Sequence, residues 1–571
     1  MSLDFPGKIR PSQLVTTFGP GSIVDLPHDS VMIMGLEWWP KDPTRYETIH
    51  DERLQAWLGL KELHVPVTPQ ESDGHVPCLP FPVYRVCVVC SSLAPAFYDV
   101  SNATYRCPEK DCRGRTYPAR LITACEKGHI DDFPWSAWVH GDAGGEAHDL
   151  KLISLKRTAS LSDLMVTCVT KGCGKKRTLG SALSPDGVSR VVPHCNGKRP
   201  WLRDDQECDR KPLGLQRGAS NVYFSVPVSS LSIPPWTSPL AARVDDHWST
   251  IAQLQETNPK VLQTVISELF KGEDIDEVWS LIRKRQEIPG KADLRSDEWL
   301  AFRNPVPPNE RNFQIFPEPV PSGISQWVET LVRVARLREV RVLRGFQRIS
   351  PPDPEEERKI TIVPISRSRL QWLPAVEVFG EGIFFALNKK KLLDWEQLPG
   401  VVNRTESLRR VFQHWRSIQG LPTTEMPSPR FVLLHTLNHA IIRQLSLESG
   451  YSSASIRERV YSSQDMYGAL IYTSASDSEG SLGGLVRQGK PSSFEPLLRN
   501  SVTSMLYCSS DPLCAENNPE ETNTMNGAAC YSCCFLSETS CERTNRLLDR
   551  QFVLPSTDST ISYFGDLEAE E

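Results

Sequence analysis

Apolar residues recur with helical spacing in two parts of this 571-residue chain. Residues 237–305 include VLQTVISELF and DEVWSLIRK, in which apolar positions fall at i, i+3 and i+4 and so line one face of a helix. Residues 430–448, RFVLLHTLNHAIIRQLSLE, repeat this spacing over a longer stretch. The pattern predicts a helical middle region and one long amphipathic helix near the C-terminal end.

Other stretches indicate strands. Residues 222–228 alternate loosely between apolar and polar positions, which is typical of a strand. Residues 369–387 hold two apolar runs around Gly380 and Gly382, which predicts a strand, a turn and a second strand. Residues 467–489 begin as a buried strand and continue as an acidic, glycine-rich loop. Together with the helices, these segments predict a multi-domain α+β fold.

The segment 325–349 carries six arginines among leucines and valines. We expect a helix here. Its arginines cannot share one helical face, so some should pair with Glu329 and Glu339 and others are available to a phosphate or a protein partner. The candidates for DNA contact in this segment are Arg341, Arg344 and Arg348.

The sixteen cysteines form sets with the spacing of metal ligands. The first set has a C-x2-C and a C-x4-C knuckle, the pattern of a zinc ribbon. It consists of Cys87, Cys90, Cys107 and Cys112. The second set combines C-x4-C with C-x12-C and consists of Cys168, Cys173, Cys195 and Cys208. We expect one zinc ion at each set.

The third set contains six cysteines in a polar window near the C-terminus, which exceeds the four that one tetrahedral zinc needs. The favoured ligands are Cys508, Cys514, Cys533 and Cys541, with Cys530 an equal contender. Adjacent residues rarely bind the same ion, so we expect Cys534 to point away. The segment MSLDFPGKIRPSQ lacks the apolar core of a signal peptide, and no run of eighteen apolar residues occurs. We therefore expect a cytoplasmic chain that does not span a membrane, whose reduced thiols favour Zn²⁺ over disulfides.

Two histidine-containing motifs allow more than one interpretation. His435 and His439 have the i, i+4 spacing of a metal-binding pair, but H-T-L-N-H lacks the glutamate of H-E-x-x-H, so a packed or hydrogen-bonded pair is favoured. Cys125 and His129 can also bind a metal, although we favour a loop held by hydrogen bonds. Asp477 and Glu479 can hold a metal or order a turn, and the sequence does not decide between them.

The net charge of −6 gives no general attraction to nucleic acid, so DNA binding requires a local basic patch. Basic residues surround the second cysteine set, where they suit phosphate contacts, although a solvated surface explains the charge equally well. These candidates are Lys175, Lys176, Arg177, Lys198 and Arg199.

The sequence contains no Walker A motif, D-E-x-H box, methyltransferase motif or recognisable nuclease set. We therefore expect no enzyme but a zinc-stabilised scaffold that binds DNA with a helicase partner. One alternative is a metal-dependent hydrolase that uses His435, His439, Asp477 or Glu479. Another is an assembly scaffold that does not contact DNA.

Several short motifs occur in a specific order along almost the whole chain. They are FGPGSIVDL, CEKGHIDDFPW, LQRGASNVYF, LREVRVLRGFQRI, WLPAVEVFGEGIF, SEGSLGGLV and the terminal CSSDPLC…CYSCC…SCERTNRLLDR. In these motifs the chain resembles the B subunits of DISARM anti-phage systems, the DrmB family. Its C-terminal part is similar to the helicase-associated zinc domain of the MrfA type, which also ends certain superfamily 2 helicases.

The resemblance implies a non-motor accessory subunit that joins a separate helicase, DrmA, and helps to load or block DNA, including single-stranded or overhang DNA. It implies no catalytic residue. The family's zinc cysteines correspond to Cys508, Cys514, Cys530, Cys533 and Cys541. The expected organisation is an N-terminal region at 1–77, two zinc-ribbon-like modules at 78–236, a helical and mixed α/β region at 237–429, and a helicase-associated zinc-binding domain at 430–571.

Overall fold

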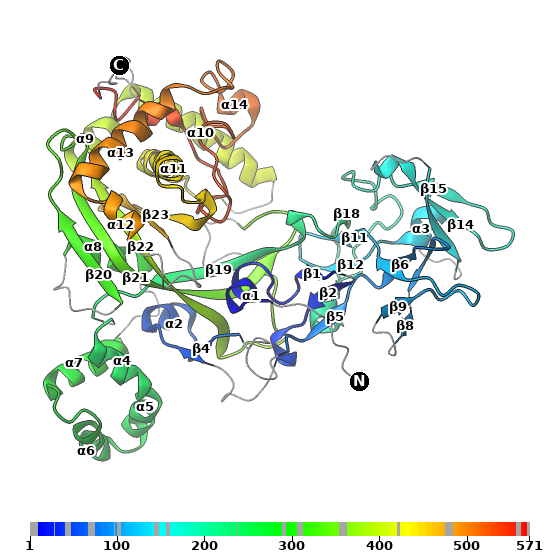
Figure 1. Ribbon diagram of the computed structural model, residues 1–571, viewed down its shortest axis with the longest axis horizontal. Coiled ribbons are helices and arrows are strands. Elements are labelled where there is room, and N and C mark those ends of the chain that lie inside the picture. Colours follow the sequence, from blue (N-terminus) through cyan, green and yellow to red (C-terminus); the bar gives the residue numbers. More distant parts are fainter. Residues whose placement is uncertain are drawn as a thin grey trace. The chain divides into compact units, whose positions relative to one another are not determined.

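The structure is a computed structural model. It describes residues 9–27, 29–39, 47–66, 75–95, 97–99, 104–141, 148–155, 160–235, 237–287, 293–304, 312–352, 362–418, 423–473, 483–554 and 561–567. The described chain forms helices and several sheets, which confirms the α+β class (Figure 1). No helix within these ranges is long and apolar enough to cross a membrane.

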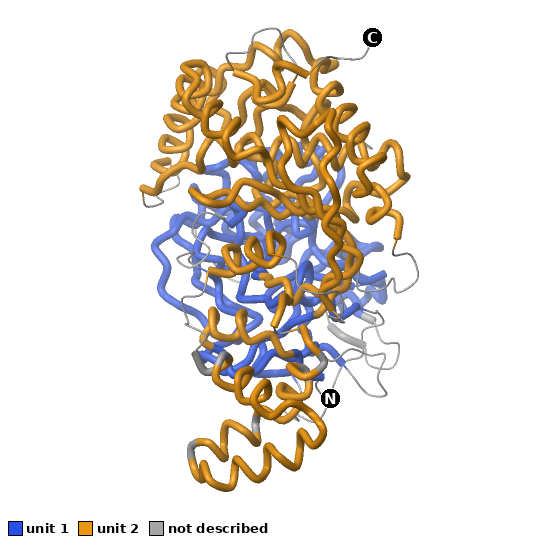
Figure 2. Tube along the Cα trace, turned by 90° about the vertical axis from the view of Figure 1, so that its left-hand side faces the viewer, with its two compact units in different colours: residues 1–49, 60–228, 341–376 blue, residues 50–59, 229–340, 377–571 orange. Residues whose placement is uncertain are grey.

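The chain divides into two units, and each is built from segments that are far apart in sequence (Figure 2). Unit 1 comprises residues 1–49, 60–228 and 341–376, and unit 2 comprises residues 50–59, 229–340 and 377–571. The expected regions 1–77 and 78–236 fall mostly within unit 1, whereas the expected region 237–429 contributes to both units.

Unit 1 consists mainly of short strands. Its elements are α1 (Pro11–Thr16), β1 (Ile23–Asp25), β2 (Ser30–Ile33), β3 (Thr48–Ile49), β4 (Glu62–His64), β5 (Cys78–Pro80), β6 (Tyr84–Cys87), β7 (Ser92–Pro95), β8 (Phe97–Asp99), β9 (Thr104–Arg106), β10 (Thr116–Pro118), β11 (Leu121–Ala124), β12 (Ile130–Asp132), α3 (Trp135–His140), β13 (Leu150–Ser154), β14 (Leu164–Cys168), β15 (Lys176–Thr178), β16 (Lys198–Arg199), β17 (Asp204–Asp205) and β18 (Leu213–Gln216). Its largest sheet has the order β10-β6-β7-β13-β14-β15.

Two apolar clusters hold unit 1 together. One cluster includes Phe133, Trp135 and Trp138 together with apolar residues of the largest sheet. The other includes Trp201 and Phe346, whose ring centroids are 5.3 Å apart. Strands this short bury little surface by themselves, so the packing must be supported by links between their connecting loops.

Unit 2 contains the long strands and most of the helices. Its elements are α2 (Glu52–Leu58), α4 (Pro239–Asp246), α5 (Trp248–Thr257), α6 (Pro259–Leu269), α7 (Ile275–Glu287), α8 (Leu294–Arg303), β20 (Phe313–Glu318), α9 (Lys389–Glu396), α10 (Pro399–Ile418), α11 (Pro429–Ser449), β23 (Ile456–Ser462), β24 (Tyr467–Thr473), α12 (Gly484–Gln488), α13 (Pro491–Thr503) and α14 (Pro519–Thr522). Three strands span the boundaries of the units: β19 (Phe224–Leu231), β21 (Val328–Gln347) and β22 (Trp372–Leu387). The sheet order is β19-β21-β22-β24-β23, and β20 pairs with β21.

The helix α11 forms the centre of unit 2 (Figure 1). Pro429 occupies its first turn, and Gly450 ends it in the left-handed conformation (φ 70°). The prediction of a helix is confirmed, as is that of the helices between residues 237 and 305. However, residues 430–442 are buried on every face rather than on one, because α11 packs against β23, β24 and α13.

Two predictions of local structure are wrong. Residues 328–347 form the strand β21 rather than a helix, because their valines are buried and their arginines find partners in the same sheet. Arg333 pairs with Glu318, and Arg338 Nε lies 2.6 Å from Glu377 Oε2. Residues 372–387 form one continuous strand without a turn, in which Gly382 pairs with Tyr472 of β24. A Cβ atom on Gly382 would lie 2.5 Å from the carbonyl oxygen of Ile471, so this close approach requires glycine.

Candidate metal centres

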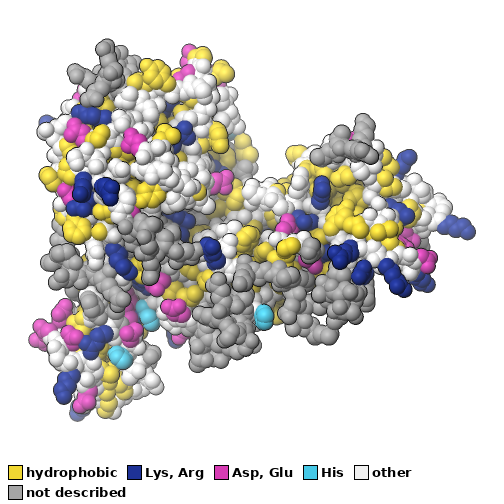
Figure 3. Space-filling model, in the orientation of Figure 1, with side chains coloured by type: hydrophobic (Ala, Val, Ile, Leu, Met, Phe, Trp, Pro, Cys, Tyr) yellow, Lys and Arg dark blue, Asp and Glu magenta, His cyan; other side chains and the backbone are white. Residues whose placement is uncertain are grey.

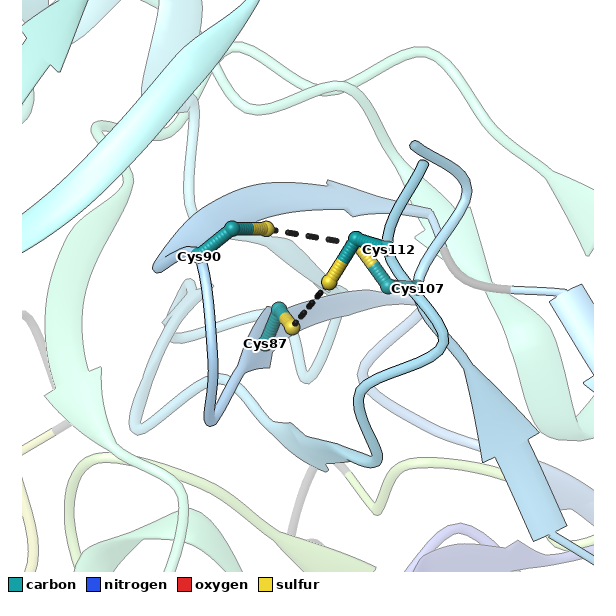
Figure 4. A group of neighbouring side chains, drawn as sticks. All are labelled: Cys87, Cys90, Cys107 and Cys112. Atoms are coloured by element: carbon teal, nitrogen blue, oxygen red, sulfur yellow. Dashed lines mark hydrogen bonds between the residues drawn. The ribbon is translucent and has the colours of Figure 1, made fainter. Parts of the chain in front are cut away.

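The first centre, here called the ribbon centre, consists of Cys87, Cys90, Cys107 and Cys112 (Figure 4). Cys87 ends β6 and Cys90 lies in the following turn, while Cys107 and Cys112 flank the turn between β9 and β10. The Sγ atoms of Cys87 and Cys112 are 3.7 Å apart, and those of Cys90 and Cys107 are 3.5 Å apart. The structure therefore brings together the four thiols that the spacing grouped.

The second cysteine set does not form one site. Cys168 and Cys173 instead meet two histidines, at distances of 3.5 Å from Sγ of Cys168 to Nδ1 of His148 and 3.4 Å from Sγ of Cys173 to Nε2 of His140. Nδ1 of His140 donates to the carbonyl of Ser136 (2.8 Å), which leaves Nε2 free to face the thiols. We call His140, His148, Cys168 and Cys173 the hairpin centre, because its cysteines lie on the β14–β15 hairpin.

Cys195 and Cys208 belong to a different group, the loop centre, together with Cys125 and His129. Sγ of Cys125 lies 3.5 Å from Nδ1 of His129 and 3.9 Å from Sγ of Cys208. The β11–β12 turn supplies one pair of these residues, and the segments on either side of β16 and β17 supply the other. The geometry corrects two expectations: the four cysteines of the second set do not share a site, and His129 lies among thiols rather than only supporting a loop.

The C-terminal centre consists of Cys508, Cys514, Cys530 and Cys533. Its Sγ atoms are 3.4 Å apart between Cys508 and Cys530, 3.7 Å between Cys514 and Cys533, and 3.8 Å between Cys530 and Cys533. Cys530, left as an equal contender, is therefore part of this group. Cys534 is buried and does not take part, as its position next to Cys533 suggested.

The dimensions of these four groups fit zinc. A tetrahedral ion with Zn–S bonds of about 2.3 Å and Zn–N bonds of about 2.0–2.1 Å separates two sulfur ligands by about 3.8 Å and a sulfur and a nitrogen ligand by about 3.6 Å. The observed separations lie between 3.4 and 3.9 Å. Backbone N–H groups also point at the sulfurs, for example from Val89 to Cys87 and from Gly197 to Cys195, both at 3.4 Å.

The thiol of Cys168 has thiolate character before any metal binds. Burial by itself would raise the pKa of the Cys168 thiol, but hydrogen bonds from Thr170 and the neighbouring His140 and Cys173 lower this pKa to about 6. The thiolate is the form that binds metal, so Cys168 is prepared for an ion at neutral pH. Gly172 and Gly174, with φ of 88° and 62°, shape the turn that carries Cys173.

Comparison with known proteins agrees with the metal chemistry. Residues 437–534 match the MrfA Zn-binding domain, a range that includes the whole C-terminal centre. Residues 10–224, which include the other three centres, match a domain of unknown function (DUF8724). A curated relative, the DISARM protein DrmB from Bacillus paralicheniformis, is 33% identical over 568 residues, which cover 95% of this chain and 99% of that protein.

The chain belongs to the DrmB family. It is therefore a DISARM defence subunit, and zinc is the cofactor indicated by its MrfA-type domain and its Cys and His clusters. Each of the four centres can supply the four ligands of a structural site in which no position is left open for a substrate. In this DrmB-family chain the ribbon, hairpin and loop centres link loops between the short strands of unit 1, which is the support that unit 1 requires.

Cys541, expected among the C-terminal ligands, lies elsewhere in the DrmB-family fold. It joins His435, His439 and Glu458 in a separate buried group. Both histidines are packed and hydrogen-bonded, as the sequence favoured, but their second ring nitrogens also face Glu458 and Cys541. Glu458 lies on β23, outside every motif of the sequence, and only the fold brings it to α11. Asp477 and Glu479 lie outside the residues that the structure describes.

The basic residues expected to contact DNA differ in their availability. Lys175 and Lys176 are exposed on the β14–β15 hairpin. The guanidinium of Arg177 instead lies 3.8 Å from the ring centroid of Trp138 and donates to its carbonyl. Lys198 is exposed but pairs with Asp131 at 3.0 Å, and Arg199 pairs with Asp204 at 2.6 Å.

The arginines at the end of β21 and directly after it are less available still. Arg348 is buried, and its guanidinium donates to the carbonyls of Gly21, Gly128 and Val222. Arg341 is also buried, Arg344 is half-buried, and both have partners within the protein. The expectation that Arg348 and Arg341 contact phosphate is therefore corrected, because a buried guanidinium cannot reach DNA in this fold.

Proposed function

We propose that this chain is a non-motor subunit that pairs with a separate helicase, of the DrmA type, and contributes phosphate contacts to DNA. The observation that carries the proposal is the cationic hairpin above the hairpin centre. Residues 164–183 contain four basic residues and no acidic one. Lys171, Lys175 and Lys176 are exposed there, and Lys and Arg side chains project from the part of unit 1 that contains α3, β14 and β15 (Figure 3).

A rigid hairpin suits this role. Zinc at the hairpin centre would tie the β14–β15 turn to α3 and to the segment before β13, so the lysines would be presented on a fixed backbone. Contacts of this kind go to phosphate oxygens and do not read base sequence. The chain would therefore strengthen DNA binding by the complex without selecting the sequence.

The motor function is assigned to a partner for two reasons. The sequence has no Walker A motif to hold the phosphates of ATP. The C-terminal domain also resembles one that occurs fused to helicases, which suggests that here it contacts a helicase carried on another chain. We accordingly propose that the chain has no catalytic activity of its own and should not hydrolyse ATP when purified alone.

The test is a co-purification with the helicase from the native cell, followed by DNA-binding titrations of the complex over a salt series. We expect Lys171→Ala/Lys175→Ala/Lys176→Ala to weaken binding to all DNA sequences alike. The slope of log K against log salt should fall by about 0.9 for each phosphate on duplex DNA that is no longer neutralised by a lysine. The matched control is Lys260→Ala/Lys271→Ala, which removes exposed lysines from and after α6 and should leave the slope unchanged.

Two results would contradict the proposal. Equal slopes for the hairpin variant and wild type would remove the hairpin from the DNA path, and retained helicase binding would then favour an assembly scaffold. Failure to recover a helicase, together with hydrolytic activity that depends on bound metal, would favour the hydrolase alternative.

A further inference from the structure

A cluster of four buried polar side chains lies in the core of unit 2. His435 and His439 lie one turn apart on α11, Glu458 lies on β23, and Cys541 follows the C-terminal centre in sequence. The two histidines are fully buried, and Glu458 and Cys541 are 2% and 8% exposed. The ligand atoms of all four side chains lie within 4.8 Å of one another.

The hydrogen bonds of the two histidines determine which ring nitrogens face this point. Nδ1 of His435 lies 3.3 Å from the carbonyl of Leu547, and Nδ1 of His439 lies 2.8 Å from the carbonyl of Cys534. A carbonyl can only accept, so each ring carries a proton on Nδ1 and, when neutral, presents a lone pair at Nε2. Histidines that bind metals are oriented in this way by a hydrogen bond from the other nitrogen.

The other two side chains are held in the same manner. Sγ of Cys541 accepts hydrogen bonds from the backbone N–H groups of Arg543 (3.3 Å) and Asn545 (3.2 Å), which stabilise a thiolate. The Glu458 carboxylate accepts from Nδ2 of Asn438 (3.2 Å) and from the backbone of Glu542 (3.1 Å). Both groups are thereby fixed before any ligand binds.

The four inner atoms need a proton or a cation between them. Nε2 of His435 lies 3.0 Å from Oε1 of Glu458 and 3.2 Å from Sγ of Cys541. Nε2 of His439 lies 3.5 Å from Oε1 of Glu458 and has no hydrogen-bond partner among the described residues. Lone pairs that face one another in a buried site, beside a carboxylate and a thiolate, are costly unless a positive charge lies between them.

We propose that His435, His439, Glu458 and Cys541, here called the core centre, bind a fifth metal ion. Two imidazole nitrogens, one carboxylate oxygen and one thiolate form a mixed donor set that suits a borderline divalent ion such as Zn²⁺. Bonds of about 2.0–2.2 Å to nitrogen and oxygen separate such ligands by about 3.4 Å, close to the separations observed. Four protein ligands complete the shell, so the ion is structural rather than catalytic.

The position of the core centre gives the ion a definite role. It joins α11, β23 and the segment that follows the C-terminal centre, which are parts of the chain separated by up to about a hundred residues. His439 binds the carbonyl of Cys534, and the preceding residue, Cys533, belongs to the C-terminal centre. The two centres therefore share a stretch of backbone, and loss of either ion should weaken the other site.

The test is the metal content of the purified full-length chain, measured by native mass spectrometry and by elemental analysis. We expect five ions per wild-type chain, and at least one fewer in His439→Gln and in Cys541→Ser. Matched controls are His414→Gln, an exposed histidine on α10, and Cys78→Ser, a cysteine outside every group; both should retain five ions. Wild-type metal content in both His439→Gln and Cys541→Ser would overturn the proposal in favour of a metal-free ion-pair cluster.

A second measurement covers the case in which these variants do not fold. When cadmium replaces the metal ions of the wild-type chain, the cadmium NMR resonance of the core centre should lie upfield of the resonances of the cysteine-rich sites. The reason is that only one of the four donors in the core centre is sulfur. The hairpin centre has two sulfur donors and should resonate between these extremes. A spectrum without a signal attributable to a single-sulfur site would also overturn the proposal.

Discussion

The division of the second cysteine set between two centres can be tested by counting metal ions in variants. Sγ of Cys173 lies 3.4 Å from Nε2 of His140 in the hairpin centre, whereas Sγ of Cys208 lies 3.9 Å from Sγ of Cys125 in the loop centre. The informative variants are Cys173→Ser, Cys208→Ser and the combination of both. If one ion were bound by all four cysteines of the set, these two residues would be ligands of that ion.

The two arrangements predict different numbers. Each single variant should lose one zinc ion under either arrangement. The double variant should lose two ions if the structure is right, and only one if the four cysteines share a site. Structural zinc sites contribute apparent binding free energies of about 10–16 kcal/mol in zinc-finger peptides, so removal of a thiolate should make the affected ion accessible to a chelator that leaves the others bound.

The assay is elemental analysis after dialysis against such a chelator, with protein measured independently. Cys78→Ser is the control, because Cys78 belongs to none of the metal-binding groups among the described residues. A double variant that retains all but one ion, or a Cys173→Ser variant that loses none, would refute the assignment. If the variants are insoluble, stepwise zinc release from wild type with a thiol reagent should still distinguish the centres by their different sulfur content.

Three further predictions concern stability and pH. Glu298 and Arg459 form a buried ion pair at 2.6 Å. Glu298→Gln and Arg459→Met should each lower the free energy of unfolding by about 3–5 kcal/mol, because each leaves one buried partner without the other. Urea unfolding of the double variant should show a loss smaller than the sum of the two single losses. Burial raises the pKa of Glu298, but the positive charge of Arg459 outweighs burial and leaves this pKa below its usual range. The ionised carboxylate therefore stabilises the fold at pH values above the ordinary glutamate pKa, and this stabilisation is lost as the pH falls through the lowered pKa. The difference in unfolding free energy between wild type and Glu298→Gln should accordingly shrink in acid. Arg348→Met removes three charge-assisted hydrogen bonds of about 1.5–3 kcal/mol each, so it should destabilise unit 1 by about 3 kcal/mol or more in the same unfolding assay without changing the salt slope of DNA binding.

Periodicity was sufficient to predict the helices but not the long strands. The helix at 430–448 and those between 237 and 305 have lengths and caps that local sequence determines. Leucine and arginine favour helices, and in residues 325–349 they obscured the valines that favour a strand. The decisive interactions, such as that of Arg338 with Glu377, are made with strands distant in the sequence and leave no local pattern.

The same limit applies to the metal centres. Cys87, Cys90, Cys107 and Cys112 could be grouped because all four ligands lie within one short stretch. Spacing could not show that Cys168 and Cys173 meet His140 and His148, because histidine is common in other roles. It also could not pair Cys125 with Cys208, which are 83 residues apart. Glu458 offers no sequence signal at all, since a single buried glutamate on a strand resembles many others.

The interleaved order of the two units has a consequence for how the protein is made on the ribosome. Residues 341–376 belong to unit 1, where Arg348 binds three backbone carbonyls and Val363 would lie only 2.1 Å from a Cβ atom on Gly128. At translation rates of about 5–20 residues per second, synthesis from residue 228 to residue 376 takes roughly 7–30 s. During this interval the thiols of unit 1 have been synthesised but their surroundings are incomplete. Zinc that binds early would protect the nascent segment from oxidation and misfolding until its last strand arrives.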